Sequence, residues 1–249
     1  MFGEWKPLIW LIATLLPLFL TKSWINRHIQ GLGLLLFGDS DVAMVLYFVL
    51  LLPGIIVHEV SHWLAATLLG VKVGKVSLGP TKKARGRMRF GSVRVGRSDP
   101  LRDSLIGLAP LIGGSAAILL IADLAFGIEP LSQLPLSQVP AKILAYARAP
   151  DAWLWLYLVF AISNAMLPSE ADRRPWPSLL IFLALAAVLS YFTGLVPRLP
   201  EGMKPLILRG VDRLSYAFGL ALLVDLIFMA IIYLLEGSAG RIMGRRVEY

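Results

Sequence analysis

The chain's long apolar runs are the feature that most constrains its fold, because they are too many and too long for a soluble core. About 20 consecutive apolar residues form a helix that crosses a bilayer. Of the 249 residues, 57% are hydrophobic. The sequence therefore predicts an all-α polytopic membrane protein, a single domain over residues 1–249 with about six transmembrane helices. The predicted spans are Leu8–Leu20 (extendable to Trp24), Val42–Leu69, Leu105–Phe126, Trp153–Leu167, Leu179–Val196 and Leu214–Leu235.

Shorter segments between these runs are interpreted as connections. Gly31–Phe37 is apolar but too short to span, so we expect it to be interfacial or re-entrant. The Pro- and Ser-rich stretch Glu129–Pro140 is predicted to be an outer loop, as is Pro197–Arg213. No internal repeat is present, and the core of the domain is predicted to cover residues 42–176.

The basic loop of residues 71–103 orients the chain. It holds ten Lys or Arg residues against Asp99 and Asp103, and basic loops stay on the cytoplasmic side. With six spans, both termini are then predicted to be cytoplasmic. The net charge of +8 favours contact with anionic lipid of the bilayer rather than with nucleic acid, because the basic residues lie next to the spans.

The same loop alternates apolar and polar residues. Val71–Val73, Val76–Leu78, Arg87–Phe90 and Ser92–Val95 have the two-residue period of strands, with Gly79-Pro80 and Gly86 between them. We expect a small membrane-associated β-hairpin or sheet after the second helix. Its free edge could pair with an extended peptide.

A His-Glu-x-x-His motif lies inside the second apolar run. On a helix, His58 and His62 project from one face, about 6 Å apart along the axis. Two imidazoles so placed can hold one zinc ion, and Glu59 lies beside them where a general base is expected. Ionisable residues are costly within a membrane span and usually functional there. The chain has no cysteine, which excludes thiolate ligands.

A third metal ligand is expected after the fourth run. Trp153–Leu167 gives about 22 Å of helix, short of a hydrocarbon core of about 30 Å, and Pro168 should end it. The following irregular segment must then line the protein interior or a wet cavity. It carries Asp172, our choice of third ligand, and Glu170, the first alternative. His28 and Asp225 are further alternatives.

Two separate motifs resemble those of the site-2 protease family of intramembrane zinc metalloproteases, over roughly His58 to Asp172. The matching residues are His58-Glu59-Val60-Ser61-His62, Gly70–Val73, Ser77–Pro80, and Asn164, Pro168 and Asp172. The likeness is to a divergent member without a PDZ domain. The proline follows Asn164 by four residues instead of three, and Arg173 stands where the family has glycine.

The resemblance implies His58, His62 and Asp172 as zinc ligands, Glu59 as general base and Asn164 as a substrate-binding residue. It also implies that the β-structure presents an unwound transmembrane protein substrate. The expected function is an intramembrane zinc metalloprotease that hydrolyses peptide bonds in or near transmembrane segments. The alternatives are a catalytically silent member that binds client helices, and a zinc hydrolase of another amphiphilic substrate. The oligomeric state stays open.

Overall fold

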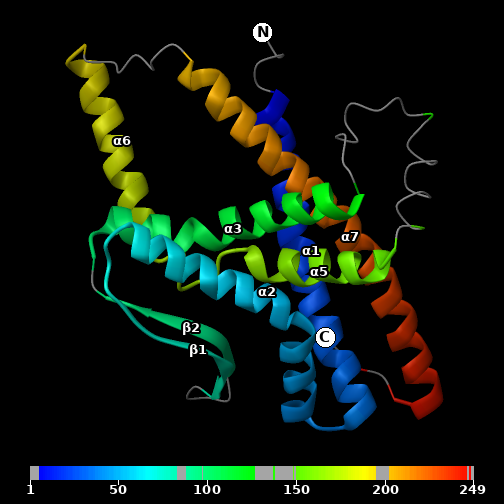
Figure 1. Cartoon of the computed structure of the whole chain (residues 1–249). Coiled ribbons are helices and arrows are strands. Elements are labelled where there is room, and N and C mark those ends of the chain that lie inside the picture. The colour runs from blue at the N-terminus through cyan, green and yellow to red at the C-terminus, as the bar shows by residue number, and fades with distance from the viewer. Residues whose placement is uncertain are drawn as a thin grey trace.

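The computed structural model describes residues 6–82, 88–96, 98–126, 150–194 and 202–245, with the single residues 137, 148 and 247 (Figure 1). Within these residues six helices and two strands are assigned. They are α1 (Lys6–Phe37), α2 (Ser40–Leu68), β1 (Val73–Lys82), β2 (Met88–Val95), α3 (Pro100–Phe126), α5 (Ala152–Met166), α6 (Trp176–Phe192) and α7 (Met203–Met243). The predicted outer loop Glu129–Pro140 lies almost wholly outside the described residues.

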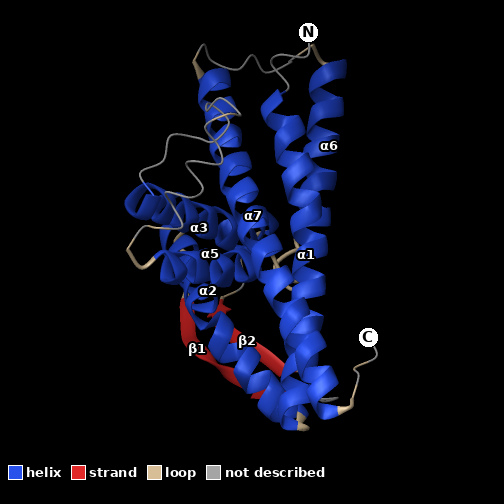
Figure 2. Cartoon of the chain, turned by 90° about the vertical axis from the view of Figure 1, so that its right-hand side faces the viewer, coloured by secondary structure: helices blue, strands red, loops and turns tan. Residues whose placement is uncertain are grey.

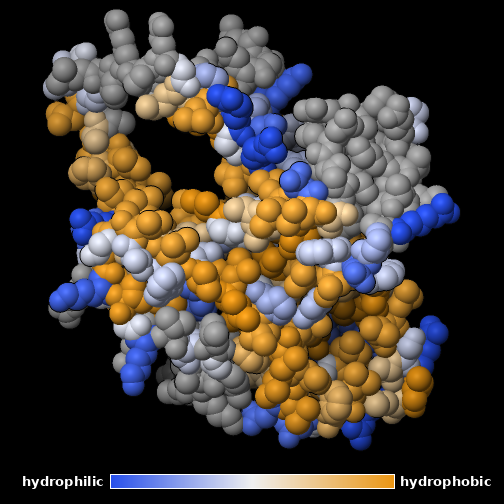
Figure 3. All heavy atoms as spheres, in the orientation of Figure 1, coloured by the Kyte–Doolittle hydropathy of each residue, from blue (hydrophilic) through white to orange (hydrophobic). Residues whose placement is uncertain are grey.

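Four of the described helices are long and apolar enough to cross a membrane: α1, α2, α3 and α7. Apolar side chains cover much of the face seen in Figure 3, and many on these helices are more than half exposed. This confirms the class of a helical membrane protein. The helices α5 and α6 are also apolar but have only 15 and 17 residues, so the count of six spans stays a prediction.

Two expectations about connections are wrong. Gly31–Phe37 is not a separate segment, because α1 continues through it to Phe37. The reason is helix packing: Gly33 is buried, and a Cβ there would lie 2.9 Å from Cα of Ala43 in α2. Likewise α7 begins at Met203, so much of the predicted loop Pro197–Arg213 is helical. Pro205 does not prevent this, because it lies in the first turn, where a backbone donor is not needed.

The helices fall into two groups that cross one another. α1 packs along α7, whereas α2, α3 and α5 pack against each other. In Figure 2, α1, α6 and α7 run along the long axis of the molecule, and α3 and α5 lie across it. The contact of α2 with α5 requires Gly54, because a Cβ at this position would lie 1.9 Å from the carbonyl oxygen of Ala161. This close approach brings the middle of α2 to the end of α5.

The two strands pair antiparallel, with Val73 opposite Val95 and Lys82 opposite Met88. Irregular register between these pairs bends the hairpin, which lies along α2 (Figure 1). The loop then enters α3, where the backbone N–H groups of Leu101 and Arg102 donate to Asp99. The hydrogen bond from Arg102 lowers the pKa of the Asp99 carboxyl. Two strands occur within the loop for which the sequence predicts strands, but β1 runs through Gly79-Pro80, the expected break between strands. The association of the hairpin with the membrane stays a prediction.

Candidate metal centre

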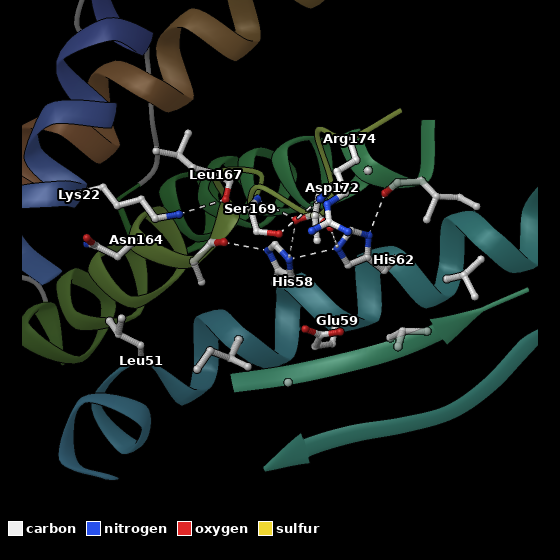
Figure 4. A pocket seen from close by; sticks show the side chains of 18 of the residues that line it. Lys22, Leu51, His58, Glu59, His62, Asn164, Leu167, Ser169, Asp172 and Arg174 are labelled. Carbon is white, nitrogen blue, oxygen red and sulfur yellow. Dashed lines mark hydrogen bonds and ion pairs between the residues drawn. The ribbon is translucent and has the colours of Figure 1, made fainter. Parts of the chain in front are cut away.

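The α2 helix directs both histidines of the motif toward one point (Figure 4). The Nε2 atoms of His58 and His62 are 3.1 Å apart, and the two rings are nearly perpendicular at 83°. The spacing of four residues produces this arrangement, because it brings both side chains to the same face. Pro53 lies one turn before His58 within α2, which changes direction along its length (Figure 1).

Backbone carbonyls from two other helices fix the orientation of the rings. Nδ1 of His58 lies 2.8 Å from the carbonyl oxygen of Ala165, and Nδ1 of His62 lies 2.8 Å from that of Ile106. A carbonyl oxygen only accepts, so each Nδ1 carries the proton and donates it. When both rings are neutral, the lone pairs of the two Nε2 atoms face each other across 3.1 Å. Two facing lone pairs repel each other, so a positive charge between the two Nε2 atoms, either a proton or a metal ion, makes this arrangement favourable.

Asp172 completes the group from the turn between α5 and α6. Its Oδ1 atom is 3.2 Å from Nε2 of His62, and Oδ2 is 3.7 Å from Nε2 of His58. The backbone N–H of Ser169 donates to Oδ2 over 2.7 Å and holds the carboxylate. One ligand atom from each residue lies within 4.8 Å of the others. The structure thus brings together the three residues that the sequence predicts as ligands.

The alternative ligands lie elsewhere. Glu170 is exposed, two residues from Asp172. His28 stacks on Trp24, and its Nε2 atom lies 4.0 Å from a carboxylate oxygen of Glu236. Asp225 is buried among residues of α5 and α7. Among the described residues, the histidines and Asp172 form the one cluster with metal-ligand geometry.

Glu59 lies on the neighbouring face of α2, between this helix and β2 (Figure 4). It is buried, with 6% of its surface exposed. Its carboxylate packs on Gly91 of β2, where a Cβ would lie 2.6 Å from Oε1. Gly91 also has a φ of 71°, a left-handed conformation that glycine adopts without strain. Glycine at this position therefore makes room for the Glu59 side chain under the strand.

A cavity of about 720 Å³ joins these groups. The three candidate ligands and Glu59 line it, together with Gly91, Val93 and Val95 of β2. Asn164 lines its far end, but the Asn164 amide is turned away from the histidines and donates to Asp225. The predicted contact of Asn164 with substrate stays untested.

Three residues at the site carry no strong signal in the sequence. Lys22 of α1 lines the cavity and donates from Nζ to the carbonyl oxygen of Leu167 over 3.0 Å. Gly107 of α3 lies so close to the turn that a Cβ there would be 2.2 Å from the carbonyl oxygen of Asp172. Gly91 makes room for Glu59, as described above. A lysine inside an apolar helix was the signal available for Lys22.

The protein is a helical membrane protein with a partly buried cluster of two imidazoles and one carboxylate. This donor set suits zinc, which is held by nitrogen and oxygen ligands and in catalytic sites keeps one position open. Comparison of the chain with models of protein families, with curated proteins and with solved structures gave no match.

Proposed function

We propose that the protein is an intramembrane zinc metalloprotease that cleaves membrane proteins in or near their transmembrane segments. The observation that carries this proposal is the convergence of His58, His62 and Asp172 within 4.8 Å, with Glu59 beside them in one cavity. The three ligands come from two distant parts of the chain, and two further helices supply the carbonyls that orient the rings.

The residues present fit a zinc ion. Nε2 of His58, Nε2 of His62 and the carboxylate of Asp172 offer three protein ligands. When bound, zinc supplies Lewis acidity, which polarises a peptide carbonyl and makes a water molecule more acidic.

Glu59 is the base of the proposed reaction. A carboxylate oxygen of Glu59 takes a proton from the attacking water and later gives it to the nitrogen of the leaving amine. Burial against Gly91 limits the positions that this carboxylate can adopt. Its contact with Gly91 holds the Glu59 carboxylate in the position from which we propose that it accepts the proton.

The hairpin is suited to hold the substrate. A peptide bond must leave its helix to be hydrolysed, and an extended peptide can pair with a strand edge. β2 pairs with β1 on one side, and its residues Gly91, Val93 and Val95 line the cavity. We propose that the unwound part of a transmembrane substrate lies along this strand, inside the bilayer or at its surface.

Metal content together with peptide hydrolysis tests the proposal. We expect the purified protein to hold one zinc ion per chain and to cleave a transmembrane peptide in detergent or bicelles. His58→Ala should lose both properties while keeping its elution volume and helix content. Zinc bound without cleavage of any peptide would favour the silent client-binding alternative. Hydrolysis of an amphiphilic ester but no peptide would favour the other hydrolase.

A second prediction concerns Gly107, which touches the Asp172 turn without ligating metal. In Gly107→Ala the new Cβ must displace the carbonyl of Asp172, so we expect a zinc affinity roughly 10- to 100-fold lower. Competition with a chromophoric chelator would measure it. Gly210→Ala is the matched control, because no atom of the described residues lies within 4 Å of a Cβ at that helical position. Equal affinity in both variants would contradict the assigned position of Asp172.

A further inference from the structure

A second polar cluster is buried where α5 meets α7, and the proposed hydrolysis makes no use of it. Asp225 of α7 is only 1% exposed. Its Oδ1 atom accepts hydrogen bonds from Oγ of Ser163 over 2.7 Å and from Nδ2 of Asn164 over 3.0 Å. An acidic residue within an apolar helix is costly unless its charge is compensated. The negative charge of the Asp225 carboxylate must therefore be compensated by a partner or removed by a proton.

Two oxygen atoms of this cluster are buried and have no hydrogen-bond partner among the described residues: Oδ2 of Asp225 and Oδ1 of Asn164. The amide of Asn164 is not reversed, because Nδ2 also donates to the carbonyl oxygen of Phe160 over 2.9 Å. Turning it would bring its oxygen against that carbonyl and against Oδ1 of Asp225. Both unpartnered atoms are thus acceptors, and each buried acceptor left unpaired is destabilising.

Lys22 does not compensate Asp225 by a direct ion pair. The charge of Lys22 acts on Asp225. However, Nζ of Lys22 donates to the carbonyl oxygen of Leu167, and no ion pair joins Lys22 to Asp225 in the described part of the chain. A hard cation such as Ca²⁺ needs six to eight oxygen ligands, far more than the two free oxygens here.

We propose that Asp225 is a proton-binding site and is a neutral carboxylic acid in the folded protein. The proton lies on Oδ2 and is donated to Oδ1 of Asn164. Together with the hydrogen bond from Nδ2 of Asn164 to Oδ1 of Asp225, this closes an acid–amide pair. One proton then satisfies both free oxygen atoms and removes a charge from the membrane interior. This inference does not rest on the proposed protease activity.

The pair joins α7 to the end of α5 that leads into the metal-binding turn. Asn164 is next to Ala165, whose carbonyl orients His58, and Lys22 holds the carbonyl of Leu167. A neutral Asp225 leaves this end of α5 anchored by uncharged hydrogen bonds. Loss of the proton would put a carboxylate with a free oxygen at the same place, and the contact between α5 and α7 would weaken.

Infrared difference spectroscopy tests the protonation directly. The spectrum of the wild-type protein minus that of Asp225→Asn, at pH 7 in detergent, isolates this one carboxyl group. We expect the carbonyl stretch of a protonated carboxylic acid, present also in the Lys22→Met background. Carboxylate bands in place of that stretch would overturn the proposal. A protonated band that appears only in Lys22→Met would overturn it too, because Lys22 would then be keeping Asp225 ionised.

Thermal stability gives a second, independent readout. Asn has the shape of the neutral acid and can both accept and donate in the same pair. We expect the apparent melting temperature of Asp225→Asn to stay within about 2 °C of wild type, while Asp225→Ala falls by roughly 2–12 °C because Asn164 loses its partner. Equal losses in Asp225→Asn and Asp225→Ala would contradict a neutral acid.

Discussion

Glu59→Gln is expected to reduce peptide hydrolysis by roughly 10²- to 10⁴-fold and to leave zinc binding unchanged. Gln fills the same space against Gly91 but cannot take a proton from water. The ligands His58, His62 and Asp172 keep their partners in this variant, since Glu59 is not among the residues whose atoms converge. The rate of cleavage of a transmembrane peptide and the zinc content of the same preparation are the two measurements.

Glu236→Gln is the matched control for this prediction. Glu236 is a half-buried glutamate on the apolar helix α7, and it lies near His28, away from the metal cluster. We expect its hydrolysis rate to equal that of wild type. A Glu59→Gln protein that cleaves at the wild-type rate would remove Glu59 from the proposed chemistry, whatever its zinc content.

Local patterns in the sequence predict the part of the site that lies within one helix. The spacing of His58 and His62 places both rings on one face because a helical turn takes 3.6 residues. Asp172 could also be predicted, since the short apolar run before Pro168 requires an irregular segment at membrane depth. Both predictions depend only on helix geometry and on the length that a bilayer requires.

Contacts between distant segments could not be predicted in the same way. The carbonyls of Ala165 and Ile106 orient the histidines, yet every residue has a carbonyl, so no pattern marks these two. Gly107 packs on the Asp172 turn, and a glycine in a membrane helix has many other uses. The same limitation explains the error over Gly31–Phe37, because Gly33 packs against α2 and does not interrupt α1.

The pairing of Asp225 with Asn164 is another contact between distant segments that the sequence pattern could not predict. Sixty-one residues separate the two side chains, and only the packing of α5 on α7 brings them together. The resemblance assigns Asn164 to substrate, whereas its amide lies 3.0 Å from Asp225. A polar residue in an apolar helix therefore indicates that a partner exists, but the fold decides which partner it is.

Asp172→Ala is expected to lose zinc at concentrations that saturate the wild-type protein. The variant removes one of three ligands, so its loss of affinity should exceed the roughly 10- to 100-fold typical when only a partner of a ligand is removed. The remaining imidazoles keep their hydrogen bonds to Ala165 and Ile106, so His58 and His62 stay in place. Zinc content after dialysis, followed by titration with a chelator, measures the effect.

Glu170→Ala is the control that separates the metal site from the surrounding turn. Glu170 is exposed and lies two residues from Asp172 in the same segment. We expect this variant to bind zinc as wild type does, because the carboxylate near His62 belongs to Asp172. If instead Asp172→Ala kept its zinc and Glu170→Ala lost it, the turn would have to rotate to bring Glu170 to the histidines. The backbone hydrogen bond from Ser169 to Asp172 argues against that rotation, since it holds the Asp172 carboxylate inside the turn.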